Sequence, residues 1–221
     1  MEKTRLFPVR ALCFDVGSMK IAFKEWALVC DALGRGDQSV IIRKGGIAEG
    51  REGFRFKHEA FFLFPTFFHE QPGLTRHPEP ARLLEQEQGG IGPNGEGREV
   101  ITIRYFARVE WTRWVDDWAR LRALLPFHIW QDGVIRERFE YGEPNGVHVA
   151  VLRVYRIAEP WSIAQSPRYG GCRSWLQLPE PPPGLRLPDG ALPDEGCGML
   201  PVIGDEVHEQ RISALRAVLG G

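Results

Sequence analysis

The run VITIRYFARVEW at residues 100–111 carries the strongest secondary-structure signal in this chain of 221 residues. Apolar side chains alternate with polar ones along it, and β-branched and aromatic residues dominate, as in a half-buried strand. The run VHVAVLRVYRI at residues 147–157 has the same character. Because only a few helical patterns separate the predicted strands, we expect an α+β fold. Its sheet is predicted to be mixed or antiparallel and curved, or a partly closed β-barrel, with a few packed helices.

Shorter patterns in the first third of the chain predict three further elements. Residues 21–33 follow a helical stripe of apolar side chains, and we expect the sheet to curl around this helix. Residues 39–43 are β-branched and predict a short strand. Residues 54–64 predict another strand, half-exposed in its first half, buried on both faces in its second half, and ended by Pro65.

The second half of the chain yields three more expectations. Residues 116–125 predict a helix. Residues 134–141 predict a strand that pairs as a hairpin with residues 147–157 across a turn rich in glycine. Residues 205–219 predict an amphipathic helix that ends at two glycines.

The domain organisation follows from the distribution of proline and glycine. We expect a single globular α+β domain over residues 1–178, with a long excursion at residues 71–98 that is rich in proline and glycine. Residues 179–201 hold seven of the 17 prolines. This segment predicts a proline-rich linker or an extended wrap without regular sheet or long helix. Residues 202–221 predict a C-terminal helix.

Composition limits the class of protein. The 28 basic and 29 acidic residues leave a net charge of -1, which excludes binding to nucleic acid by bulk charge alone. No apolar run is long enough to span a membrane, and the four cysteines form no C-x-x-C pair. We therefore expect a cytoplasmic protein that uses no cofactor, holds no recognisable metal-ligand spacing and has no membrane partner. The oligomeric state stays open.

Two groups of residues are candidates for ligand binding. Arg43 and Lys44 precede two glycines at the end of a predicted strand, where free backbone N–H groups and cations make an anion-binding concavity; a tight turn with solvated charges is the alternative. Because His58 and His69 also lie at strand ends, we expect them to surround one concave surface with Arg43. Replacing Arg43 by alanine is then expected to weaken anion binding by roughly 1.5–3 kcal/mol with little change in stability.

The second group follows the segment around His128. Arg136 and Arg138 alternate along the strand predicted at residues 134–141 and would share one sheet face, which suits an anionic ligand. A solvated strand face paired with neighbouring glutamates is the competing interpretation. The predicted ligand-binding residues are therefore Arg43, Lys44, His58, His69, His128, Arg136 and Arg138.

Three functional hypotheses remain open, and so does the question of whether the chain is an enzyme; no catalytic residue is assigned. The first is a nucleic-acid or nucleotide recognition module that uses arginines for phosphate and an aromatic side chain for stacking. The second is a metal-dependent hydrolase or nuclease built on His58, His69 and a carboxylate, Glu25 or Glu59. The third is a structural or regulatory protein whose P-x-x-P run at residues 179–182 engages a partner.

Several segments together are similar to a known family. They are KEW at residues 24–26, IRKGGIAE at 42–49, FLFPT at 62–66 with His69, FHIW at 127–130, RFEY at 138–141, RVYR at 153–156 and YGGCRSW at 169–175. These segments resemble the bacterial domain-of-unknown-function family 1802 over about residues 20–178. Some members of that family are joined to a restriction-endonuclease-like domain, so the resemblance implies a link to restriction or to RNA-related processes.

A fainter resemblance concerns residues 36–43, GDQSVIIR. Following a predicted helix, they are similar to the helix, G-x-K, strand, arginine pattern of ASCH and other PUA-like β-barrels. Gln38 and Ile41 stand where that pattern has lysine and glutamate. The resemblance implies a barrel with a ligand cleft near Arg43, and a role in recognising RNA or a modified base.

Overall fold

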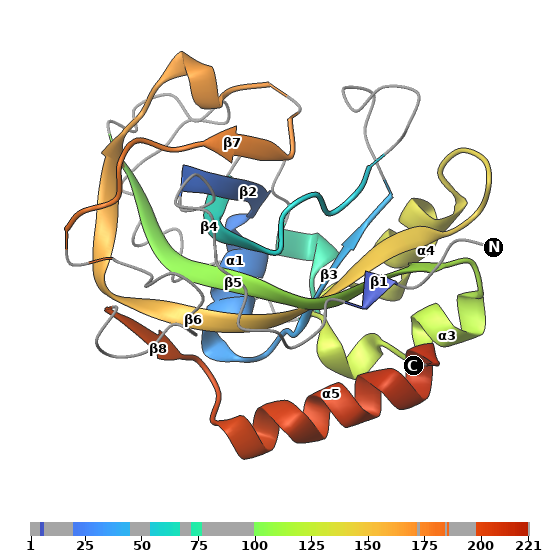
Figure 1. Cartoon of the computed structure of the whole chain (residues 1–221). Helices are drawn as coiled ribbons and strands as arrows, with labels where there is room; N and C mark the ends of the chain where they lie inside the picture. Colours follow the sequence, from blue (N-terminus) through green and yellow to red (C-terminus); the bar gives the residue numbers. More distant parts are fainter. Residues whose placement is uncertain are drawn as a thin grey trace.

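The computed structural model describes residues 5–6, 20–44, 54–66, 72–76, 100–171, 173–183, 185 and 198–220. Their strands form one mixed sheet in the order β3-β6-β5-β4-β2-β7, with β1 added beside β5 and β8 beside β6 (Figure 1). The strands are β1 (Arg5–Leu6), β2 (Ile21–Trp26), β3 (Val40–Arg43), β4 (Ala60–Thr66), β5 (Val100–Val115), β6 (Val147–Ala164), β7 (Trp175–Gln177) and β8 (Met199–Pro201).

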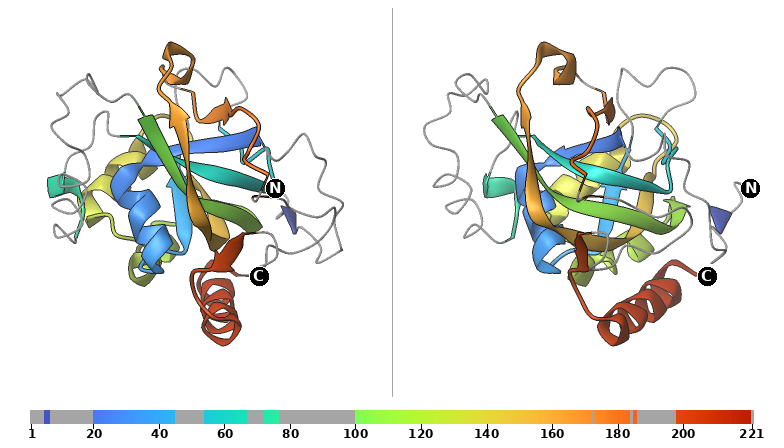
Figure 2. Two further views of the ribbon diagram at one scale, coloured as in Figure 1. Left: turned by 90° about the vertical axis from the view of Figure 1, so that its left-hand side faces the viewer. Right: turned by 60° about the vertical axis from the view of Figure 1, so that its left-hand side comes forward.

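The described helices surround this sheet. They are α1 (Ala27–Arg35), α3 (Trp118–Arg122), α4 (Asp132–Glu140) and α5 (Asp205–Leu219), with short 3-10 turns at Pro72–Leu74, Leu125–Phe127 and Pro167–Tyr169. The turned views in Figure 2 show the strands bending around α1, with α5 lying below the sheet. This arrangement confirms the predicted α+β fold with a curved, mixed sheet. Among the described strands the sheet stays open, so no barrel closes.

The two long strands dominate the fold, as residues 100–111 and 147–157 predict. β5 and β6 pair antiparallel from Val100↔Ala164 to Val115↔Val147, with register shifts between Ile103 and Tyr105 and between Val109 and Trp111. Such bulges bend a strand and increase its twist. They give this pair the curvature that lets it wrap the core.

Strand β4 is buried on both faces, as predicted. Phe61 and Leu63 belong to the main core cluster around α1, whereas Phe62 and Phe64 belong to a second cluster on the other face of the sheet. Contrary to expectation, β4 begins only at Ala60, so residues 54–59 form no strand, and Pro65 does not end it. β4 runs parallel to β2 as far as the pair Trp26↔Thr66, and Pro65 is tolerated because a residue at the end of a strand need not donate a ladder hydrogen bond.

The helix predicted over residues 21–33 is wrong in its first half. Residues 21–26 are strand β2, which pairs parallel with β4 and antiparallel with β7, and helix α1 starts only at Ala27. Ala22 and Phe23 alternate between the two core clusters, as strand residues must. Two strand neighbours outweigh the local helical stripe, because tertiary pairing overrides a weak propensity.

The strand predicted over residues 134–141 is also wrong. These residues belong to helix α4, whose buried side chains Ile135 and Phe139 lie one turn apart. The glycine-rich segment after them is a turn from helix to strand, with Gly142 and Gly146 at positive φ. Arg136 and Arg138 therefore share no sheet face.

The amphipathic helix predicted over residues 205–219 is confirmed. α5 spans Asp205–Leu219 and buries Ile212, Leu215 and Leu219 in the main core. The predicted helix at residues 116–125 is shorter, because α3 ends at Arg122. Within the described part of residues 179–201 only the last three form a strand, β8, which pairs with β6. The prediction that this segment forms no sheet is therefore wrong at its end. Of the helices that the structure describes, none is long and apolar enough to cross a membrane.

Candidate functional site

A buried carboxylate marks the point where β2 passes into α1. Glu25 is only 2% exposed. Its Oε1 accepts a hydrogen bond from the backbone N–H of Trp26 at 2.8 Å, and its own backbone carbonyl accepts one from the Thr66 hydroxyl at 3.1 Å. Because a buried carboxylate is costly without a cation, this position requires a positively charged partner.

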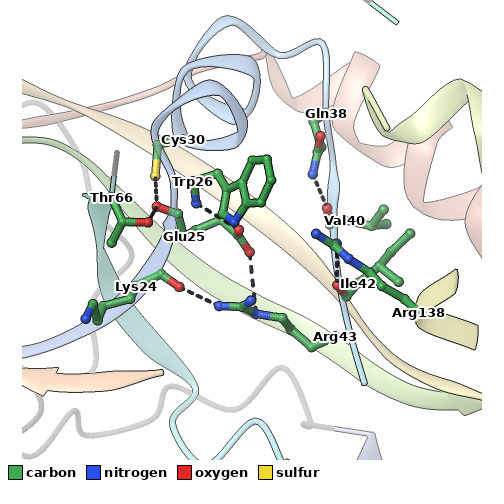
Figure 3. Close-up of polar contacts among 10 residues, drawn as sticks. All are labelled: Lys24, Glu25, Trp26, Cys30, Gln38, Val40, Ile42, Arg43, Thr66 and Arg138. Atoms are coloured by element: carbon green, nitrogen blue, oxygen red, sulfur yellow. Dashed lines mark hydrogen bonds and ion pairs between the residues drawn. The ribbon is translucent and has the colours of Figure 1, made fainter. Parts of the chain in front are cut away.

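Arg43, the last residue of β3, supplies that partner (Figure 3). Its Nε lies 3.7 Å from Oε2 of Glu25, and its Nη2 donates to the backbone carbonyl of Lys24 at 2.8 Å. The guanidinium also lies over the ring of Phe23, 5.1 Å from its centroid. Nε has no hydrogen-bond acceptor among the described residues. With a quarter of its side chain exposed, Arg43 joins the buried carboxylate to solvent.

A second guanidinium reaches the same place from helix α4. Arg138 donates from Nη1 to the backbone carbonyl of Ile42 at 3.2 Å and stacks on Trp130 with 4.1 Å between guanidinium and ring centroid. Burial lowers the pKa of Arg138 to about 10, while the Glu25 carboxylate raises this pKa and Arg43 lowers it. The group is still a cation at neutral pH, and its charge is coupled to both partners. Glu25, Arg43 and Arg138 thus form one electrostatic unit.

Two tryptophans bound this unit. The rings of Trp26 and Trp130 meet edge to face with 4.9 Å between centroids. His128 holds Trp130 in place, because its Nδ1 accepts the Trp130 backbone N–H at 3.2 Å. Burial, together with the nearby charge of Arg76, lowers the pKa of His128 to about 4. At neutral pH His128 is therefore an uncharged residue of the core that positions Trp130.

Lys44, the residue after the end of β3, has contacts separate from those of Arg43. Its Nζ donates to the backbone carbonyls of Phe139 at 3.3 Å and Pro144 at 2.5 Å, and it lies 5.3 Å from the ring centroid of Trp114. Burial lowers the pKa of Lys44 and Glu143 raises it. Lys44 thus anchors the turn between α4 and β6 rather than joining the Arg43 unit.

The remaining predicted residues are spread more widely. The His58 ring lies 4.8 Å from the ring of Trp175, which is itself 4.8 Å from Phe23, the ring beneath Arg43. Burial lowers the pKa of His58, and Lys57 adds to this effect. His58 and Arg43 therefore border one aromatic cluster, Phe23 and Trp175. His69 and the glycines after Lys44 lie outside the described residues.

Arg136 is separated from Arg138 although both are in α4. Its side chain is exposed, pairs with Glu140 one turn along at 3.1 Å and lies over Trp118. Residues two apart in a helix point in nearly opposite directions. The shared face expected for Arg136 and Arg138 is therefore wrong, and of the two only Arg138 reaches β3, at the backbone carbonyl of Ile42.

The metal-site hypothesis finds no support in the described part of the chain. There, no group of three or more histidine, cysteine or acidic side chains lies close enough to hold a metal ion. His69 is outside that part. Glu25, one of the two carboxylates considered for a metal, instead serves as the counter-ion of Arg43.

The partnership of Glu25 with two arginines and the role of Trp130 were not predicted from the sequence. One signal was available: Glu25 and Lys24 are the two charged residues in the otherwise apolar run at residues 21–30. A carboxylate at a buried position predicts a cation opposite it. The identity of that cation depends on which strand and helix lie nearby, and this is decided by the fold.

The unit formed by Glu25, Arg43 and Arg138 lies within the part of the chain that matches a known protein family. A profile described as "Domain of unknown function (DUF1802)" matches residues 22–195. The chain belongs to the DUF1802 family. The match includes Glu25, Arg43, Trp130 and Arg138, whereas helix α5 of this DUF1802 protein lies beyond it. No curated protein matches the chain.

Solved structures similar to the DUF1802 chain include ASCH from Zymomonas mobilis, with 13% identity and a TM-score of 0.36 over 60% of this chain and 66% of that chain. A single-substitution variant of the same protein is 12% identical, with a TM-score of 0.39 over 72% of this chain and 90% of that chain. Both are structures of the same ASCH protein.

Proposed function

We propose that this DUF1802 protein recognises a nucleic acid or a nucleotide by binding a phosphate group against Arg43 and Arg138. The observation that carries the proposal is the placement of two guanidinium groups, from β3 and α4, beside one buried carboxylate. Arg43 pairs with Glu25, and Arg138 donates to the backbone carbonyl of Ile42, the residue before Arg43. Guanidinium groups bind phosphate through paired N–H donors in a planar fork.

The charges around Glu25 do not balance, and this favours an anionic ligand. Two arginines beside one buried glutamate leave one positive charge in a half-buried place, because Glu137, which also acts on Arg138, is exposed to solvent. Burial already disfavours the charged form of Arg138, as its lowered pKa records. A bound anion restores the counter-charge that water no longer supplies.

Aromatic side chains beside the cations suit the rest of a nucleotide. Trp26 is half-buried and contacts Trp130, on which Arg138 stacks. Base–aromatic stacking contributes roughly 1–3 kcal/mol per base and tolerates any base. In this proposal the arginines hold the phosphate and Trp26 offers its ring to a base. Because the net charge of the chain is -1, binding relies on this local unit.

The test is fluorescence anisotropy with labelled single-stranded RNA and DNA of one sequence, about 12 nucleotides long. Wild-type protein should bind, with affinity falling as salt rises because counter-ions are released. Arg43→Ala should weaken binding about 10- to 100-fold, the scale of a charge-assisted hydrogen bond. Arg43→Lys should lie between the two, because it keeps the charge beside Glu25 but loses the fork.

Arg136→Ala is the matched control. It removes the same charge from the same helix, but from the exposed side that faces away from Arg43. We expect its affinity to stay within about twofold of wild type, since exposed ion pairs contribute little. Equal losses in the Arg43 and Arg136 variants, or no binding of either oligonucleotide by wild type, would overturn the proposal.

A further inference from the structure

We infer that the unit of Glu25, Arg43 and Arg138 selects a phosphate that carries one negative charge, the internal diester of a nucleic-acid strand. It discriminates against the doubly charged monoester of a free nucleotide. The inference rests on the proposed function, because it names the class of phosphate that the same site takes. Glu25 is the residue that sets this selectivity.

The charge count is the first step. Arg43 and Arg138 contribute two positive charges, and Glu25 removes one, so one positive charge is left to balance. A phosphodiester carries one negative charge. A phosphomonoester carries between one and a half and two at neutral pH, since its second pKa is about 6.

The two neighbouring lysines keep their charge but bind elsewhere. The Lys24 ammonium donates to the backbone carbonyls of Tyr169 and Gly171, at 2.7 and 2.8 Å, and points away from Arg43 (Figure 3). Lys44 is engaged with carbonyls at the turn after α4, where Glu143 lies near it. Glu137, which acts on Arg138, is exposed to solvent, and water screens exposed charges.

Glu25 acts as a fixed charge rather than as a group that an incoming anion displaces. Its carboxylate is anchored by the Trp26 backbone N–H at 2.8 Å, whereas Arg43 Nε stays 3.7 Å away. The arginine can therefore turn to a ligand without releasing the glutamate. The carboxylate remains within a few ångströms of the bound phosphate and repels any charge beyond the first.

Burial makes the second charge unfavourable. Attraction to the site grows in proportion to the ligand charge, but the desolvation penalty of an ion grows with the square of its charge. Glu25 is almost fully buried and Arg43 is three-quarters buried, so a phosphate here loses part of its hydration. A single charge is compensated by the site, whereas a second charge is desolvated without a partner.

Binding of two small ligands to the intact protein tests this inference by calorimetry or by tryptophan fluorescence. A dinucleoside monophosphate carries one diester and no terminal phosphate, and the matching nucleoside 5′-monophosphate carries one monoester. At pH 8 we expect the diester to bind about tenfold more tightly. At pH 5 the monoester is mostly singly charged, so the difference should shrink to about twofold.

The Glu25→Gln variant tests the residue that sets the selectivity. Glutamine keeps an oxygen for the Trp26 N–H but removes the negative charge, which leaves the site with two uncompensated cations. The monoester should then bind about tenfold more tightly than in wild type at pH 8, and the preference for the diester should disappear. Glu140→Gln, at an exposed carboxylate beside Arg136, should leave both affinities unchanged.

The outcomes separate the two proposals. Tighter binding of the monoester by wild type at pH 8, or an unchanged preference in a folded Glu25→Gln protein, would overturn the inference while leaving phosphate recognition intact. Failure of both ligands and of the oligonucleotides to bind would overturn the proposed function itself. If Glu25→Gln does not fold, the two wild-type pH values still decide the question.

Discussion

Arg43 has a structural role besides the proposed contact with a ligand. From the sequence, its replacement by alanine is expected to change stability little. The structure revises that expectation, because Arg43 is the cation nearest to a carboxylate that is 2% exposed. Removing one partner of a buried pair leaves the other charge without compensation.

We therefore predict that Arg43→Ala lowers the free energy of unfolding by about 2 kcal/mol, less than the full loss of a buried pair because Arg138 remains near Glu25. Arg43→Ala combined with Glu25→Gln should recover part of this loss, since no buried charge is then left unpaired. Urea unfolding of the four proteins measures the coupling. Strictly additive effects in this cycle would show that the two side chains do not interact.

Because of His128, we predict that the protein loses stability in mild acid. Its folded pKa is about 4, lowered from 6.5 mainly by burial. Below about pH 6.5 His128 binds a proton in the unfolded chain but stays neutral in the folded chain. The contribution of His128 to the free energy of unfolding is therefore fully present above that pH and is lost as the pH falls toward 4. The expected loss between pH 7 and pH 5 is about 2 kcal/mol.

His128→Asn is the variant for this test, because the asparagine side-chain oxygen can accept the Trp130 N–H in place of Nδ1. Its free energy of unfolding, measured in urea at pH 7 and pH 5, should depend less on pH than that of wild type. An identical pH dependence in the two proteins would assign the acid sensitivity to another group.

At the level of elements, helix α1 packs against β5 through a glycine. Gly34, in the last turn of α1, leaves room for Tyr105: a Cβ added there would lie 2.0 Å from Cζ of the tyrosine ring. The Gly34 carbonyl also accepts a hydrogen bond from Arg156 of β6 at 3.1 Å. The absence of a side chain brings the helix close to both long strands.

Gly34→Ala should consequently destabilise the protein by about 2 kcal/mol, the usual cost of overpacking. In a free helix the same change is favourable by about 1 kcal/mol. A destabilising effect in the protein would therefore indicate the close contact between Gly34 and Tyr105. Gly34→Ala combined with Tyr105→Ala should be less destabilised than the sum of the single changes. Thermal melts of the three variants check this, and a stabilising Gly34→Ala would refute the close contact.

For the whole molecule, a group of charged side chains joins α5 to the sheet. The Glu110 carboxylate of β5 accepts from Arg108 Nη2 at 2.6 Å and lies 3.5 Å from His208 Nε2 of α5. Arg153 of β6 pairs with Asp205 at the start of the helix. Burial alone would raise the pKa of Glu110, but hydrogen bonds from His208 and Arg108 and their charges lower it to about 2.

Acid should therefore release this contact. A carboxyl group with a lowered folded pKa contributes stability above its unfolded value of about 4.5, and that contribution is lost as the pH falls toward 2. Between pH 5 and pH 3 the expected loss is about 2 kcal/mol. Glu110→Gln should lose this dependence and should speed hydrogen exchange of the α5 backbone amides at pH 7.

Glu209→Gln provides the comparison, because Glu209 is an exposed carboxylate on the same helix. Its α5 exchange rates should match those of wild type. If the Glu110 and Glu209 variants exchange alike, then apolar packing of Ile212, Leu215 and Leu219 holds the helix, and the ionic cluster contributes nothing measurable.

Local patterns were enough to predict the elements that carry strong periodicity. β5, β6 and α5 follow from alternation or from an amphipathic repeat within their own residues, and β4 follows from a continuous apolar run. These features depend on neighbours in the chain, so the sequence by itself is sufficient for them.

The ambiguous segments required the assembled fold. Residues 21–26 satisfy a helical stripe, yet two strand partners make them β2. Residues 134–140 alternate in charge, yet Ile135 and Phe139 bury one face of α4. In both cases a short stretch satisfies two periods about equally, and burial against distant residues settles which one forms.

The candidate site shows the same division. The sequence identified Arg43 and Arg138 as cations suited to an anion, because residue type and local setting carry that information. Their meeting at Glu25 arises from the register that places β3 beside β6 and from the packing of α4 over the end of β3. Side chains far apart in the chain converge only when long-range pairing brings their backbones together, and no local pattern encodes that distance.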